Sequence, residues 1–418
     1  MSRLVNRFTW VERRGPAFPI YAIFATNGLL FATWVSRLPA VRERLDASEP
    51  ELGAALLCVA IGSLVSMPAT GWLCDRFGAR RVLMVAMTAC ASAFELAVLA
   101  PSVPLLGATL VLVGGTYGMW DVAMNASGHQ VELNGGRPLM PGFHGAFSLG
   151  GLTGAGLGAL AAGTGLMPWA HMATGAVLAV IIGLVVVPHV IEPLRHHPSP
   201  ASDTPRRGRR IPMRLVALGL LTACTTLGEG AAADWGALFL HDERGASEST
   251  AAVGYAVFSC AMAIGRFGGT WALARISRVR ALRLSGVIIS AALMLLVAVD
   301  LIPLSLAAMA GWGFGVAIVF PAAMSAAAEH SARPAQGIAM VATIGYGGFL
   351  VGPPLIGFLA GHVGLGVALW VVAALGVVLF VLAPAASPGS THGTPGATTL
   401  DGRGGQQLDG DCTEGVRA

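Results

Sequence analysis

The chain has 418 residues, of which 55% are hydrophobic and only 11% are charged. An ordinary soluble domain carries about 25% charged residues. Because a single globular interior is limited in size, this much apolar chain argues against a large soluble protein. The net charge of +4 indicates no particular partner, and the 26 basic residues are all arginine.

Long apolar stretches follow one another along most of the chain. A membrane-spanning helix needs about 20 mostly apolar residues, because hydrocarbon offers the backbone no hydrogen-bond partners. The sequence therefore predicts an all-α membrane protein with about twelve spanning helices. They are expected at 18–36, 51–74, 80–100, 104–128, 139–163, 165–188, 213–240, 250–274, 281–300, 303–328, 335–360 and 363–384.

The segments outside these spans divide the chain into five parts. Residues 1–17 form a basic N-terminus without a signal-peptide cleavage site, so the first helix is expected to stay uncleaved. A basic, Pro-containing linker at 189–212 separates two six-helix halves, 18–188 and 213–384. The tail, 385–418, is rich in Gly, Thr and Asp, which is typical of disorder.

The positions of the arginines predict the orientation. With both termini in the cytoplasm, most arginines fall on the cytoplasmic side, as the positive-inside rule requires. Arg266 lies within a helix, and the exceptions on the outer side are Arg37, Arg42, Arg44 and Arg244. An even number of helices places the linker inside as well. The pattern predicts a multi-pass membrane protein with both termini in the cytoplasm.

The two halves resemble each other weakly in sequence, about 200 residues apart. Matching positions recur in the same order, namely Trp34 and Trp235, Gly53 and Gly254, and Gly150-Gly151 and Gly347-Gly348. Parallel repeats of this kind are related by a pseudo-twofold axis along the membrane normal.

The most distinctive local pattern is the run GWLCDRFGARR at residues 71–81. Gly71 allows close helix approach, and Gly78 permits a tight turn. Asp75 is able to accept hydrogen bonds from a helix N-terminus or from an arginine across the interface between the halves. We interpret the run as a cytoplasmic gating motif, and the alternative is a basic loop that only sets topology. The candidate gating residues are Gly71, Asp75, Arg76, Gly78, Arg80 and Arg81.

This run resembles the signature loop of the major facilitator superfamily, G-x-L-x-D-R-x-G-x-R-R. The resemblance extends over roughly 18–384 and implies a secondary transporter that works by alternating access. In the second half, Ala274 and Ser277 stand where the motif has its acid and its second glycine.

Shorter stretches are similar to the branch that contains the fucose permeases and their uncharacterised bacterial relatives. Residues 265–271 read GRFGGTW, and Asp121 lies four residues before Asn125, as an acid does before an asparagine in fucose permease. Residues 229–235 and 34–39 look more like the uncharacterised relatives. Fucose permease has an aspartate in its first helix, whereas this chain offers only Asn27, so its two-carboxylate proton scheme does not transfer whole.

Several polar residues are expected at membrane depth, where a charged side chain costs at least about 2.5–3.5 kcal/mol on insertion scales. Asp121 and Asn125 share a helix face, and we favour proton coupling or substrate binding for Asp121 over a structural ion pair. The same two roles stay open for Glu229 and Arg266, with a structural ion pair favoured for Arg266. His144 is either a proton relay or a packing residue, and Asp234 lies near the outer end of its helix.

Tryptophans form a further group of candidates. An indole ring stacks on a sugar ring, but core packing or a place in the interfacial belt explains any one tryptophan better. The candidates are Trp34, Trp120, Trp235 and Trp312.

Three functions are compared. We favour proton-coupled uptake of a small polar, sugar-like solute by a monomer, without cofactor, metal or nucleic acid. Proton-driven efflux of hydrophobic compounds is the alternative, although residues 148–154 lack the proline of the antiporter motif in helix 5. A non-transporting sensor would want an additional soluble domain. No enzyme is indicated, since a chain without lysine has no G-x-x-x-x-G-K-[ST] loop for nucleotides.

Overall fold

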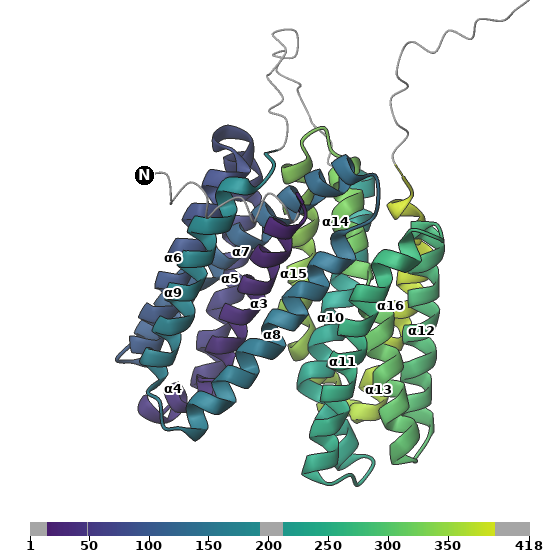
Figure 1. Cartoon of the computed structure of the whole chain (residues 1–418). Coiled ribbons are helices and arrows are strands. Elements are labelled where there is room, and N and C mark those ends of the chain that lie inside the picture. Colours follow the sequence, from purple (N-terminus) through teal and green to yellow (C-terminus); the bar gives the residue numbers. More distant parts are fainter. Residues whose placement is uncertain (1–14, 48, 193–211, 389–418) are drawn as a thin grey trace, which may run out of the picture. The chain divides into compact units, whose positions relative to one another are not determined.

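The computed structural model describes residues 15–47, 49–192 and 212–388. Within them, helices α3 to α9 form the first half and helices α10 to α16 form the second (Figure 1). The expected N-terminus, linker and tail lie almost entirely outside the described residues.

The first half comprises α3 (Phe18–Val35), α4 (Leu38–Arg44), α5 (Glu49–Phe77), α6 (Ala79–Leu99), α7 (Val103–Gly135), α8 (Met140–Gly163) and α9 (Pro168–Val186), followed by the 3-10 turn η1 (Val187–His189). The second comprises α10 (Met213–Asp242), α11 (Glu248–Leu273), α12 (Arg278–Ala298), α13 (Ile302–Val316), α14 (Val319–Glu329), α15 (Pro334–Val363) and α16 (Leu365–Leu382), followed by the 3-10 turn η3 (Ala383–Ala386).

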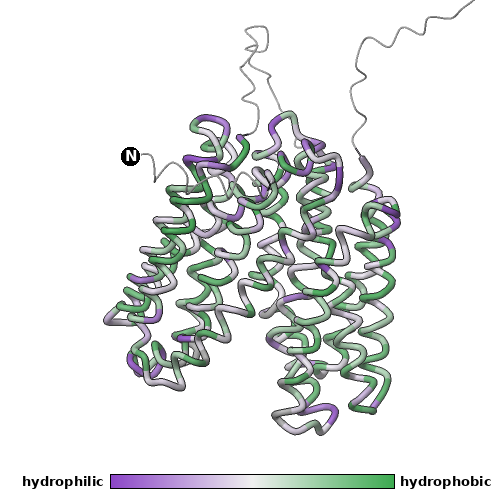
Figure 2. Tube along the Cα trace, viewed as in Figure 1, coloured by the Kyte–Doolittle hydropathy of each residue, from purple (hydrophilic) through white to green (hydrophobic). Residues whose placement is uncertain are grey.

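Twelve helical stretches among the described residues are long and apolar enough to cross a membrane, which confirms the predicted all-α class. Hydrophobic residues extend along the lengths of the helices, and hydrophilic residues gather near their ends (Figure 2). Large apolar side chains such as Val65 and Leu152 remain exposed on the outside. A bilayer covers such side chains, because lipid tails are as apolar as they are.

The largest differences between the predicted spans and the structure occur at three places. The fourth span continues to Gly135, beyond the expected end at 128. A short helix, α4, lies between the first two spans. The tenth span is split into α13 and α14, because Pro321 has no N–H and its ring would clash with the carbonyl of Ala317 in a continuous helix.

Helix packing pairs the elements within each half and then joins the halves. In the first half, α3 packs on α8 and α5 on α7, and in the second half α10 packs on α15 and α12 on α16. Between the halves, α5 packs on α15 and α8 packs on α11. We call the end of the bundle that carries residues 71–81 the motif end, and the other the opposite end.

Candidate functional site

A polar cluster begins on α7, in the middle of an otherwise apolar helix. Asp121 is only 5% exposed, and Asn125 is fully buried one turn further on. The Asn125 side-chain amide donates to the backbone oxygen of Asp121 at 2.9 Å and lies 3.3 Å from Asp121 Oδ1. Asp121 Oδ2 is buried and has no hydrogen-bond partner among the described residues. The second carboxyl oxygen is therefore open to a proton or a ligand.

His144 of α8 extends this cluster to a second helix. Its Nε2 lies 3.1 Å from Asn125 Oδ1, which is an acceptor, so the imidazole donates from Nε2. The imidazole lies between two phenyl rings in edge-to-face contact, Phe24 at 5.0 Å and Phe320 at 5.3 Å. Phe24 belongs to α3 of the first half and Phe320 to α14 of the second. The rings hold the imidazole in place and shield it from water.

Ser148 and Arg266 join the two halves at the next turn of α8. Ser148 Oγ donates to the backbone oxygen of His144 at 3.2 Å and accepts from Arg266 Nη1 of α11 at 2.8 Å. Arg266 Nη2 lies 3.5 Å from Glu229 Oε1 of α10, and the Glu229 side chain is 16% exposed. This ion pair is long, so the guanidinium is shared between the serine and the carboxylate.

These contacts form one continuous polar path through the bundle. It runs from Asp121 through Asn125 to the imidazole of His144, continues from the backbone oxygen of His144 to Ser148, and reaches Arg266 and Glu229 in the second half. The path holds two acids and one arginine. With a neutral imidazole the path carries a net charge of −1, and one added proton would make it neutral.

Asn27 of α3 lies at the same depth as Asp121. Phe24, one turn before it, contacts His144, and Phe31, one turn after it, packs on Tyr117 at 5.5 Å. Since α3 and α7 run in opposite directions, residue 27 falls opposite the turn between 117 and 125. Asn27 is fully buried, and neither of its amide atoms has a hydrogen-bond partner among the described residues.

The other candidates lie away from the path. Trp34 is buried against Phe94 at 5.8 Å, inside the first half, as core packing requires. Trp120 is fully buried next to Asp121 in the chain, and its indole nitrogen has no partner among the described residues. Asp234 is exposed on α10, whereas Glu229 on the same helix points to Arg266.

The 71–81 run brings the halves together at the motif end. A side chain on Gly71 would place its Cβ 2.8 Å from Gln336 Cα, so only glycine permits this approach of α5 to α15. Gln336 Nε2 donates to Asp75 Oδ2 at 2.8 Å, so a glutamine of the second half is one donor to this latch. Gly78 starts α6 with a φ of 91°, a left-handed value that favours glycine.

The remaining charged residues of the run are exposed. Arg80 Nε donates to the carbonyl oxygen of Val190 at 2.5 Å, which ties the run to the end of the first half. Arg76 and Arg81 are exposed at the surface of this end.

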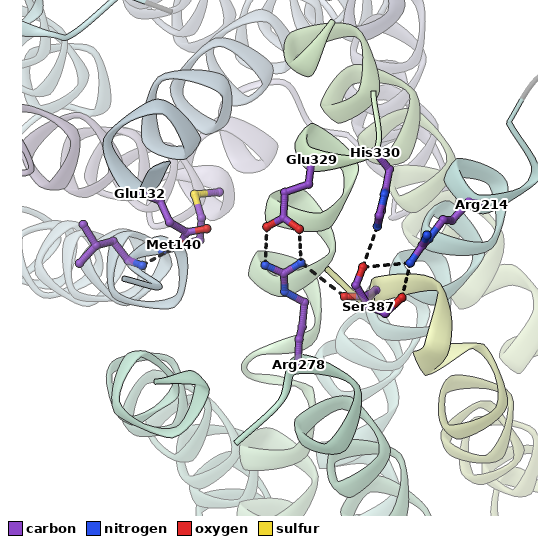
Figure 3. A network of polar contacts seen from close by, with 9 residues as sticks. Glu132, Met140, Arg214, Arg278, Glu329, His330 and Ser387 are labelled. Carbon is purple, nitrogen blue, oxygen red and sulfur yellow. Dashed lines mark hydrogen bonds and ion pairs between the residues drawn. The ribbon is translucent and has the colours of Figure 1, made fainter. Parts of the chain in front are cut away.

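A second polar network ties helix ends of the second half (Figure 3). Arg278 forms a bidentate ion pair with Glu329, at 2.6 and 2.9 Å. His330 and Arg214 both contact the backbone oxygen of Ser387, at 2.7 and 2.9 Å. This network fixes the ends of α10, α12, α14 and α16 to one another, so they would move as one body.

The sequence did not single out several residues that complete the site. Gln336 carries no charge and lies in no motif, and Phe24, Phe320 and Tyr346 are aromatic residues in apolar helices, where nothing marks them. Tyr346 packs on Phe320 at 6.5 Å and so extends the aromatic layer around His144. Among the described residues, no three His, Cys, Asp or Glu side chains lie close enough together to hold a metal ion.

Known proteins with a similar sequence or fold are membrane transporters. A family model described as Major Facilitator Superfamily matches residues 18–348. An uncharacterized transporter of Sinorhizobium fredii is 36% identical over 373 residues, covering 87% of this chain and 96% of that protein. An uncharacterized MFS-type transporter of Yersinia pestis is also 36% identical, over 84% of this chain and 91% of that protein. Among solved structures, the fucose:proton symporter of E. coli matches with a TM-score of 0.69 at 16% identity, over 88% of this chain and 98% of that one.

Proposed function

We propose that this chain, which belongs to the major facilitator superfamily of membrane transporters, takes up a small polar solute together with a proton. The observation that carries the proposal is the buried path from Asp121 to Glu229. A charged group at this depth is costly and is retained where it carries an ion or binds a substrate. The fold it shares with a fucose:proton symporter supports a sugar-like solute.

In this proposal Asp121 carries the proton. Its Oδ2 is free of hydrogen bonds within the described residues, while its other oxygen is near Asn125. Asn125 and His144 connect the carboxyl group to Ser148 and Arg266, which belong to opposite halves. Because the halves move against each other in alternating access, the cross-half bond breaks and re-forms once per cycle.

The solute is proposed to bind beside this path. The unpartnered polar atoms of Asn27 and Asp121 lie on two helices of the first half, and they offer donors and acceptors to hydroxyl groups. A polar solute that satisfies these atoms would gain more than an apolar one, since buried polar atoms without partners are costly. This favours uptake of a polar solute over efflux of hydrophobic compounds.

The proposed orientation places the motif end in the cytoplasm, together with both termini. In this orientation the contacts of Gly71 and Asp75 with Gln336 hold α5 and α15 together on the cytoplasmic side. We place the chain in the bacterial inner membrane and expect a monomer to suffice, because the whole path lies within one chain.

The experiment uses purified protein in proteoliposomes. A thermal-shift screen against sugars, polyols and amphipathic drugs first selects the solute class, because a ligand that binds the folded state stabilises it. Uptake of a stabilising polar solute is then measured with the exterior more acidic than the lumen. Symport predicts accumulation inside under this gradient. Accumulation only under the reversed gradient would indicate antiport and reject the proposal.

A further inference from the structure

A groove lies on the surface of the first half, at the opposite end of the bundle. Helices α8 and α9 both pack on α3 but barely contact each other, so a pocket of about 400 Å³ remains between them. Its apolar walls come from five leucines, Leu29, Leu157, Leu160, Leu166 and Leu178. All but Leu29 are exposed. Exposed leucines on membrane-spanning helices face lipid tails, so the groove opens to hydrocarbon.

A buried arginine is hydrogen-bonded to one of the residues that line this groove. Arg37 follows the last turn of α3 and is only 5% exposed. Its Nη2 donates to the carbonyl oxygen of Leu166, one of the leucines that line the groove. Its Nε is buried without a hydrogen-bond partner among the described residues. None of the carboxylates in the described part of the chain forms an ion pair with it.

His171 lines the same groove from α9 and is 6% exposed. Leu166, whose carbonyl oxygen accepts the hydrogen bond from Arg37, lines the groove together with His171. His171 Nδ1 also has no hydrogen-bond partner among the described residues. The groove therefore has apolar walls and one lining histidine, and next to its Leu166 lies an arginine that pairs with no carboxylate of the described residues.

A buried arginine of the second half, Arg244, is paired. Arg244 also lies at the opposite end, and its side chain is 8% exposed. Its Nη1 forms an ion pair with Asp300 at 2.9 Å. A buried guanidinium without such a partner is costly, so the anion for Arg37 is expected to come from outside the chain.

We propose that one membrane phospholipid binds in this groove, with its phosphate on Arg37 and an acyl chain between α8 and α9. Arg37 lies just beyond the end of the first span, at the depth where lipid phosphates lie. A guanidinium binds phosphate oxygens with short, charge-assisted hydrogen bonds. The lipid braces α3, α8 and α9 from the side facing the bilayer, and it does so whatever solute is carried.

The test is native mass spectrometry of the full chain, purified in mild detergent with phosphatidylglycerol added. Wild-type protein is expected to retain one phospholipid per chain. Arg37→Gln is expected to lower the retained fraction about tenfold or more, since charge-assisted hydrogen bonds exceed the roughly 1.4 kcal/mol that a factor of ten requires. Leu160→Trp keeps Arg37 and fills the groove, so it is expected to lower the retained fraction as well.

Arg244→Gln is the matched control, because it removes a similarly buried arginine that already has a carboxylate partner. Its lipid occupancy is expected to equal that of the wild type. Equal occupancy in Arg37→Gln would overturn the proposal, and so would equal losses in Arg37→Gln and Arg244→Gln. If Arg37→Gln does not fold, unchanged occupancy in Leu160→Trp overturns the proposal. Retention of a fatty acid or another non-phospholipid in place of a phospholipid rejects the assigned occupant.

Discussion

Arg266 Nη1 donates a hydrogen bond to Ser148 Oγ at 2.8 Å, and this bond joins α11 of the second half to α8 of the first. It is the point at which the polar path crosses between the halves. Movement of one half against the other would lengthen this bond before it disturbed the contacts within either half. Opening or closing of the gate is therefore expected to change this contact, and with it the continuity of the polar path.

The hydrogen bond between His144 and Asn125 predicts a graded response to substitution. His144→Leu removes the hydrogen bond to Asn125 while it keeps an apolar side chain between Phe24 and Phe320. Loss of one such bond is worth about 0.5–1.5 kcal/mol, so we expect proton-driven uptake to fall by about tenfold. His144→Gln retains a donor and is expected to be less affected. Initial uptake rates in proteoliposomes compare the two, and equal rates in the wild type and His144→Leu would exclude a relay.

The ion pair between Arg266 and Glu229 predicts a stability pattern. Removal of one partner from a buried ion pair costs about 3–5 kcal/mol, and less when one partner is partly exposed, as Glu229 is. Arg266→Gln is therefore expected to lower the thermal unfolding temperature. The double variant Arg266→Gln/Glu229→Gln is expected to recover most of that loss. Thermal unfolding in detergent measures both, and additive losses would show that the two residues are not coupled.

Gly71 predicts a change in conformational population. A leucine there would collide with the backbone of α15 at Gln336, so Gly71→Leu is expected to favour the state that is open at the motif end. Labelling of Gln336→Cys by a water-soluble maleimide, in a background without other cysteines, reports that state. Faster labelling is expected in Gly71→Leu.

Gly53→Leu is the control for that experiment. Gly53 also lies on α5, but a Cβ there would meet nothing within 4 Å. It is expected to label at the rate of the parent. Equal labelling in all three proteins would mean that α5 and α15 do not form the gate.

The spanning helices were predictable from the sequence, because each one is recognisable from the apolar residues of its own segment. Apolar length predicts a span, and no contact between helices is needed to recognise it. The break before Val319 depends on Pro321, and proline is tolerated in many membrane helices, so its effect was not foreseen. Helix α4 is too short for any length criterion.

The site was predictable as a set of residues but not as a path. Asp121, His144, Glu229 and Arg266 each stand out, because an ionisable residue in an apolar helix is visible in the sequence. Their connection depends on how α7, α8, α10 and α11 pack, and no periodicity within one helix encodes that. The glutamine that meets Asp75 is an ordinary polar residue at a helix start, so only the packed structure identifies it.

The most direct test of the account is the proton dependence of Asp121→Asn. In proteoliposomes with an acidic exterior, the wild type and the control Asp242→Asn, an exposed acid at the end of α10, are expected to accumulate the solute. Asp121→Asn is expected to exchange solute across the membrane at equal concentrations but to accumulate none under the pH gradient. Accumulation by Asp121→Asn at the wild-type level would show that Asp121 does not carry the proton.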